Sequence, residues 1–156
     1  MNILIRKEKL NGKTFEKVLA LKVTKKQEKF VASNLMSLAQ TGLYHEHARS
    51  LVILNNDEPV GFMTLDWEEE ERTVGLWRRM IDAKHQGKGY GKDALKVLIK
   101  QVKQEKKFDL MPLSLVSENI IAYELYQSFG FKKTGEIADL EEIMVLPLNE
   151  SEQPEN

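Results

Sequence analysis

The sequence predicts an α/β fold with a central mixed, mostly antiparallel sheet flanked by about four helices. Apolar residues alternate with a two-residue period in the middle of the chain, and they recur at three- and four-residue intervals before and after it. The chain has 156 residues, a formal net charge of −1, and 42% hydrophobic and 30% charged residues. This composition is typical of one soluble globular domain, which we expect to cover residues 1–148.

The first half of the chain is predicted to form one strand, two helices and a three-stranded meander. These elements are a strand over 2–8, helices over 14–23 and 26–40, and strands over 50–54, 59–67 and 74–82. Thr14 is a suitable N-cap for the first helix. Phe30, Val31 and Leu35 recur at helical spacing in the second helix, and Gly42 is expected to end it. Polar turns join the three consecutive strands, which indicates an antiparallel meander.

In the second half, helices and strands alternate. The predicted elements are a helix that begins near residue 91, a strand over 110–116, a helix over 122–129, and strands over 131–137 and 142–146. Pro112 suggests a bend or an unpaired side in its strand. Gly130 is expected to close the last helix at its C′ position. Residues 149–156 are polar and are expected to fray.

Composition excludes several functional classes. Lys plus Arg is 23 and Asp plus Glu is 24, which argues against a dedicated nucleic-acid binder. The chain has no cysteine, so disulfides, thiolate nucleophiles and Cys-ligated metals are excluded. The N-terminal segment lacks the apolar stretch of a signal peptide, and no run approaches the roughly 18 apolar residues of a membrane span. We therefore expect a cytoplasmic protein.

A glycine-rich segment, His-Gln-Gly-Lys-Gly-Tyr-Gly-Lys at 85–92, lies between a predicted strand and a predicted helix. Three alternate glycines leave backbone N–H groups accessible next to the positive end of a helix dipole. Such a place binds anions, and a pyrophosphate is a natural occupant. The spacing differs from a P-loop, and also from a dinucleotide-binding loop because residue 92 is lysine. A glycine-rich helix entry without a ligand is the alternative.

Eight lysines lie between residues 84 and 107, against the two acidic residues Asp93 and Glu105. A solvated helix face explains most of them. Lys88 and Lys92 could also attract a phosphate-rich cofactor, and His85 could assist a phosphate.

Asn119 belongs to a second informative segment, which runs over 117–131 from a predicted strand into a predicted helix. An asparagine at such a junction can cap the helix or bind a ligand amide, and both interpretations stay open.

The spacing of His45 and His47 suggests a metal site, but a third and a fourth ligand are missing from the sequence pattern. We expect a surface loop there, and no metal.

Together the two segments resemble the GNAT superfamily of N-acetyltransferases. The family pattern Q/R-x-x-G-x-G/A is matched by Gln86, Gly89 and Gly91. The later pattern N-x-x-A-x-x-L-Y-x-x-x-G-F is matched by Asn119, Ala122, Leu125, Tyr126, Gly130 and Phe131. The order of predicted elements agrees with the GNAT acyl-CoA N-acyltransferase fold over residues 1–147.

The resemblance implies transfer of the acetyl group of acetyl-CoA to an amine. Backbone N–H groups of residues 86–92 are expected to hold the CoA pyrophosphate, and the strand that ends at residues 80–82 is expected to splay from its neighbour and pair with the pantetheine arm. Tyr126 matches the tyrosine that protonates the departing CoA thiolate in many members, although it could be a packed aromatic. The cofactor-binding residues implied are Met80, Ile81, Gln86, Gly87, Lys88, Gly89, Tyr90, Gly91, Lys92, Asn119 and Tyr126.

Segments 27–34, 77–82 and 134–136 resemble those of bacterial diamine and spermine/spermidine acetyltransferases. The implied acceptor is a small-molecule amine, with a polyamine or diamine favoured, and homodimers are common in the family. Polyamines favour an acidic pocket. The acidic residues available for it are Glu28, Glu46, Asp66, Glu68, Glu69, Glu70, Glu71, Glu118 and Glu136. Ala32 and Trp77 stand where some polyamine enzymes carry acidic residues.

The general base is left open between Glu28, Asp66, Glu118 and a chain of water molecules. Direct attack by the amine is favoured over an acetyl-enzyme, because the chain has no cysteine and no evident Ser/His pair. Two alternatives remain for the function. One is a protein or peptide N-acetyltransferase, which needs an open groove, and the other is a non-catalytic acyl-CoA sensor.

Overall fold

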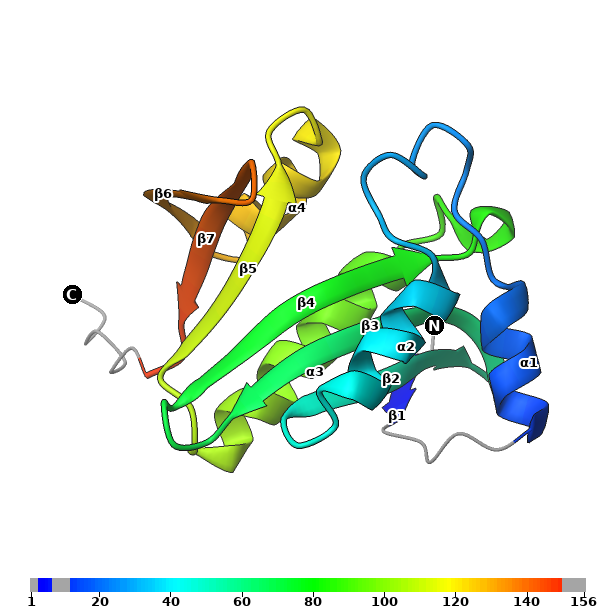
Figure 1. The fold of residues 1–156 in the computed structure, drawn as a ribbon, viewed down its shortest axis with the longest axis horizontal. Coiled ribbons are helices and arrows are strands. Elements are labelled where there is room, and N and C mark those ends of the chain that lie inside the picture. The colour runs from blue at the N-terminus through cyan, green and yellow to red at the C-terminus, as the bar shows by residue number, and fades with distance from the viewer. Residues whose placement is uncertain (1–2, 7–11, 150–156) are drawn as a thin grey trace.

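A seven-stranded sheet in the order β1-β2-β3-β4-β5-β7-β6 organises the computed structural model (Figure 1). The structure describes residues 3–6 and 12–149. The strands are β1 (Ile3–Arg6), β2 (Ala48–Asn55), β3 (Glu58–Glu68), β4 (Thr73–Ile81), β5 (Leu110–Val116), β6 (Lys132–Ala138) and β7 (Glu141–Pro147). Among these described strands, β4 and β5 form the one parallel pair, and all other neighbours are antiparallel.

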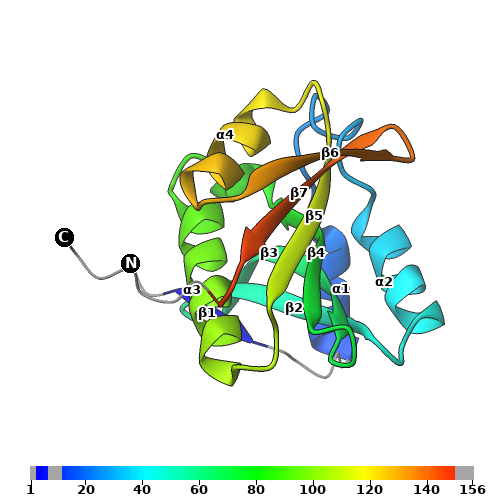
Figure 2. The same ribbon diagram turned by 90° about the vertical axis from the view of Figure 1, so that its left-hand side faces the viewer.

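Helices cover both faces of the sheet (Figure 2). On one face lie α1 (Gly12–Ala20) and α2 (Asn34–Leu43), and on the other lie α3 (Tyr90–Glu105) and α4 (Ile120–Ser128). A short 3-10 helix at Ala83–His85 precedes α3. The larger apolar core packs α3 against the sheet through Leu95 and Leu98, and a smaller core with Val18 and Phe62 lies under α1 and α2. The predicted sheet with about four helices is confirmed. Of the helices described, we find none with the length and apolar content needed to cross a lipid bilayer.

The second helix begins later than predicted. α2 begins at Asn34 rather than near residue 26, because Ser33 is its N-cap: Met36 N donates to Ser33 Oγ at 3.1 Å. Residues 24–30 form turns instead, in which Phe30 N donates to Gln27 O at 2.9 Å. The apolar spacing in this stretch therefore belongs to a loop. The predicted stop at Gly42 is also wrong by one residue, since α2 continues to Leu43.

Other element bounds differ by a few residues. α1 begins at Gly12 and ends at Ala20, so Thr14 lies inside its first turn and is not the N-cap. The strand predicted over 2–8 is present at Ile3–Arg6, and its remaining residues 2, 7 and 8 lie outside the described residues. Residues 150–156 of the predicted frayed tail lie outside them as well. Gly130 follows α4 with a φ of +99°, the left-handed conformation expected at C′.

The parallel pairing of β4 and β5 is short. Thr73 pairs with Leu110 and Leu76 pairs with Leu113, and beyond these two pairs the strands diverge (Figure 1). Pro112 has no partner in β4, as predicted for an unpaired side. On its other edge β4 stays paired with β3 as far as Ile81, with a β-bulge where the pairing passes from Leu76 to Arg78. The predicted splay is confirmed, and it opens a cleft.

Hydrogen bonds fasten the connection between α1 and α2 to the end of β4. Lys22 N donates to Asp82 Oδ1 at 2.9 Å, and Ala83 N donates to Lys22 O at 2.8 Å. The buried side chain of Asn34 donates from Nδ2 to Val18 O at 2.8 Å. Asn34 thereby gives Val18 O, at the C-terminal end of α1, a second donor beside Leu21 N, which lies 3.2 Å from the same oxygen.

We expect Asn34→Ala to lower the free energy of unfolding by about 1 kcal/mol, because the Val18 carbonyl loses the shorter of its two hydrogen bonds and keeps the one from Leu21 N at 3.2 Å. Urea unfolding followed by circular dichroism measures this change. Gln101→Ala, at an exposed position of α3, is the control and should change the free energy of unfolding by less than about 0.5 kcal/mol. Equal changes for the two variants would contradict the structural role of Asn34.

Candidate active site

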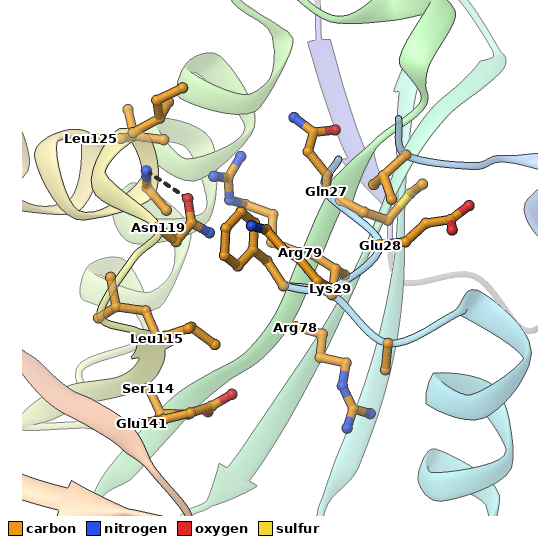
Figure 3. A pocket seen from close by; sticks show the side chains of 18 of the residues that line it. Gln27, Glu28, Lys29, Arg78, Arg79, Ser114, Leu115, Asn119, Leu125 and Glu141 are labelled. Atoms are coloured by element: carbon orange, nitrogen blue, oxygen red, sulfur yellow. Dashed lines mark hydrogen bonds between the residues drawn. The ribbon is translucent and has the colours of Figure 1, made fainter. Parts of the chain in front are cut away.

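The divergence of β4 and β5 opens a cavity of about 750 Å³ (Figure 3). Its walls come from the α1–α2 connection, β4, β5, α4 and β7. Gln27 and Glu28 lie on one side of it, Asn119 and Leu125 lie on the other, and Arg79 lies between them. A cleft of this size can enclose most of a cofactor or a drug-sized ligand.

The glycine-rich segment adjoins this cavity and forms the entry to α3. Gly87 and Gly89 have φ values of +76° and +85°, a left-handed conformation that glycine adopts without strain. Gly89 is the N-cap of α3 and offers no capping side chain, so the first N–H groups of the helix are not bound by one. They lie at the positive end of the helix dipole, where an anion is stabilised.

Side chains of the same segment are either engaged within the protein or exposed. Gln86 Nε2 donates to Ile81 O at 2.9 Å, and its amide exchanges two hydrogen bonds with the Gln27 amide, at 2.7 and 3.1 Å. Tyr90 is buried, and its hydroxyl accepts a hydrogen bond from Asn55 Nδ2 at 2.8 Å. A ligand would therefore meet Gln86 and Tyr90 through their backbone.

Asn119, the N-cap of α4, and Tyr126, within that helix, line the cavity. Ala122 N donates to Asn119 Oδ1 at 3.3 Å, so the helix-capping interpretation of Asn119 is confirmed. Tyr126 is 8% exposed, and its ring centroid lies 5.6 Å from that of Phe131. Tyr126 is thus both a core residue and part of the cavity wall.

The structure brings four of the predicted cofactor residues to one cavity, namely Met80, Gln86, Asn119 and Tyr126. The other seven are adjacent in the chain but are not among its lining residues: Ile81, Gly87, Lys88, Gly89, Tyr90, Gly91 and Lys92. The side chain of Met80 is buried in the smaller core, so its backbone is the part that can meet a ligand. The edge of β4 that faces β5 has no strand partner there.

Six charged side chains line the cavity. Four are cationic, Lys26, Lys29, Arg78 and Arg79, and two are acidic, Glu28 and Glu141. Burial lowers the pKa of Arg78, and the charge of Glu141 opposes this shift. Ser114 Oγ donates to Glu141 Oε2 at 2.7 Å.

Of the acidic residues proposed from the sequence, only Glu28 lines the cavity. Sequence reasoning missed Glu141, whose place at the start of β7 becomes visible only when that strand is paired with β5.

Asp66 and Glu68 lie with His47 and not among the residues that line the cavity. The His47 Nδ1 atom is 2.6 Å from Asp66 Oδ1 and 3.3 Å from Glu68 Oε1. The hydrogen bond with Asp66 raises the pKa of His47, and the charges of the neighbouring carboxylates add to this effect. One potential ligand atom from each of the three residues lies within 4.8 Å of the others, a grouping that the spacing of His45 and His47 did not reveal.

The raised pKa of His47 predicts how stability depends on pH. The pair of His47 with Asp66 contributes its full stabilisation of the folded state below the ordinary histidine pKa of about 6.5. This stabilisation is lost as the pH rises through the higher pKa that His47 has in the folded protein. The difference in unfolding free energy between wild type and His47→Gln should therefore shrink between pH 6 and 8. Urea unfolding across this range tests it, with exposed His45→Gln as the control. A difference that stays constant with pH argues against the charged pair.

Comparison with known proteins supports an acetyltransferase. The Acetyltransferase (GNAT) family matches residues 17–131. The chain is 31% identical over 126 residues to the spermine/spermidine N(1)-acetyltransferase of Bacillus subtilis (strain 168), an alignment that covers 77% of this chain and 82% of that relative.

Two solved structures have the same fold. The spermidine N-acetyltransferase from Vibrio cholerae, in complex with CoA and spermine, gives a TM-score of 0.73 at 16% identity, and the match covers 94% of this chain and 95% of that one. The PaiA N-acetyltransferase from Thermoplasma acidophilum, in complex with coenzyme A, gives a TM-score of 0.67 at 18% identity over 94% and 99% of the two chains. This chain accordingly belongs to the GNAT family and is an acetyltransferase.

Proposed function

We propose that the enzyme transfers the acetyl group of acetyl-CoA to the primary amine of a small molecule, and that a polyamine or diamine is the favoured acceptor. One observation carries the cofactor assignment: the unpaired edge of β4 lies beside the glycine-rich entry to α3. The acceptor is supported by the 31% identical relative, which is a spermine/spermidine acetyltransferase.

In this proposal CoA lies between the diverging strands. Backbone N–H groups of residues 86–92 bind the pyrophosphate, where the helix dipole is positive. The backbone of Met80 and Ile81 pairs with the pantetheine amides, as an added strand pairs with a sheet edge. Asn119 donates from Nδ2 to the same arm, because its Oδ1 already accepts from Ala122 N.

The reaction starts from an amine with an ordinary pKa of about 10.4, which must lose a proton before it attacks. Glu28 and Glu141 are the carboxylates of the cavity wall, and they can take this proton directly or through water. The free amine attacks the thioester carbonyl, and a backbone N–H stabilises the oxyanion. Tyr126 then protonates the departing CoA thiolate. The chain has no cysteine to form a thioester intermediate, which supports direct attack.

A peptide or protein acceptor is the second candidate, and the charge of the cavity favours it. Four of the six charged lining residues are cationic, and they attract an amine that also carries a carboxylate. A polyamine carries no such group and depends on Glu28 and Glu141. Bound CoA adds phosphate charges to the same cleft, which offset part of the cationic excess.

Gly89→Val should weaken CoA binding at least about tenfold, which corresponds to 1.4 kcal/mol, because a side chain then covers the phosphate-binding N–H groups. Gly135→Val is the matched control: Gly135 has a φ of +84° against +85° for Gly89, and an added Cβ would meet nothing within 4 Å at either position. Both substitutions impose similar strain of about 1–2 kcal/mol. Isothermal titration calorimetry should find the affinity of the control unchanged, and equal affinities would contradict the phosphate site.

The acceptor can be identified by CoA release with spermidine, spermine, short diamines and an acidic peptide. We expect turnover of the polyamines, and a KM for spermidine about fivefold to tenfold higher in Glu28→Gln or Glu141→Gln, because each loses one attractive charge. Glu124→Gln, exposed on α4, is the control and should leave this KM unchanged. Turnover of the peptide without turnover of polyamines would decide for the second candidate.

A further inference from the structure

Arg79 is a half-buried cation of β4 that lies in the cleft beside Asn119 (Figure 3). Its Nε atom is 3.5 Å from the hydroxyl of Tyr126 and is placed to donate a hydrogen bond to it. Its guanidinium carbon is 5.6 Å from the centroid of the Tyr126 ring. Among the described residues, no ion pair includes Arg79.

Gly91 provides the space for this arrangement. A Cβ at position 91 would lie 2.5 Å from the Nη1 atom of Arg79, so the missing side chain leaves room for the guanidinium. Arg79 therefore lies between the first turn of α3 and the phenol of Tyr126. Arginine can donate through Nε and through both Nη atoms, and it stays charged across the working pH range of enzymes.

We propose that Arg79 is a positioning residue for Tyr126, an inference that rests on the proposed role of Tyr126 as the proton donor. The hydrogen bond from Arg79 Nε occupies a lone pair of the phenol oxygen. The hydroxyl proton of Tyr126 then remains available to the cleft, where the sulfur of the thioester lies. The guanidinium also attracts the negative charge that forms on the phenol oxygen when this proton leaves.

The proposed proton transfer from Tyr126 accompanies the breaking of the C–S bond. When the tetrahedral intermediate collapses, its C–S bond breaks and the electron pair leaves on sulfur. The proton of the Tyr126 hydroxyl moves to that sulfur, which gives free CoA and a phenolate next to Arg79. The oxyanion re-forms the carbonyl, and the amine nitrogen, which after its attack carries one proton more than the amide does, passes that proton through water to the phenolate. The proton that the ammonium form lost before the attack goes to the solvent, so the net products are the acetylated amine, free CoA and one proton. No oxidant, reductant or further reactant takes part.

A double-mutant cycle tests the inference on the full-length enzyme. Tyr126→Phe should lower kcat about 100-fold, as expected for loss of a general acid. Arg79→Gln should lower kcat about tenfold with Tyr126 present, and it should change kcat less than twofold in the Tyr126→Phe background. The KM for acetyl-CoA should stay within threefold throughout. Arg79→Lys should recover part of the activity, because it keeps the positive charge.

The split between kcat and KM gives a second readout that a merely structural role would not change. In Arg79→Gln kcat should fall while the KM for acetyl-CoA stays nearly constant, and Arg79→Lys should restore part of kcat, because the charge on the guanidinium acts on the reacting phenol and not on cofactor binding. Gly91→Ala keeps Arg79 but forces its guanidinium away. At saturating acetyl-CoA this variant should reproduce the loss of kcat, so the inference stays testable if Arg79→Gln does not fold.

Three results would overturn the inference, and they differ from one another. A raised KM for acetyl-CoA with unchanged kcat would make Arg79 a cofactor-binding cation. An equal loss of kcat in both backgrounds would show that Arg79 does not act through Tyr126. Unchanged turnover in Tyr126→Phe would remove the proposed proton donor itself, and the role of Arg79 with it.

Discussion

The parallel contact of β4 and β5 ends after Leu76 and Leu113, and the whole site depends on this early end. If the pairing continued, β5 would occupy the backbone groups of β4 and leave no edge for a ligand. Each strand keeps its other neighbour throughout: β4 pairs with β3 to Ile81, and β5 pairs with β7 from Leu110 to Val116. The sheet therefore opens between two supported strands without losing its remaining ladders.

The wall of the cleft opposite α4 is irregular, yet it is held at several points. Asp82 and Ala83 bind the backbone of Lys22, and Asn34 binds the end of α1. These contacts place Glu28 against the diverging strands without a helix to carry it. A loop fixed on a rigid scaffold can vary its side chains without disturbing the sheet, which suits a surface that binds ligands.

The parts of the fold that the sequence predicted are those encoded locally. The meander follows from alternation and polar turns, and the glycine-rich entry to α3 follows from neighbours in the chain. The predicted start of α2 is wrong because the turns over 24–30 have apolar residues at helical spacing. Arg79 and Glu141 could not be found in this way, since Arg79 meets Tyr126 across 47 positions and Glu141 meets Ser114 across 27. Only the packing of the folded chain, with α4 against β4 and β7 beside β5, brings these partners together.

The paired amides of Gln27 and Gln86 join the irregular wall to the glycine-rich segment through two hydrogen bonds. Neither side chain carries a charge at any pH at which the protein is folded, so dissolved salt does not screen this link and protonation does not break it. The six charged residues around the same cavity behave differently, because their attraction for a ligand weakens as ionic strength rises. Ionic strength thus changes how strongly the cleft attracts its ligands, while the hydrogen bonds between Gln27 and Gln86 are not affected by it.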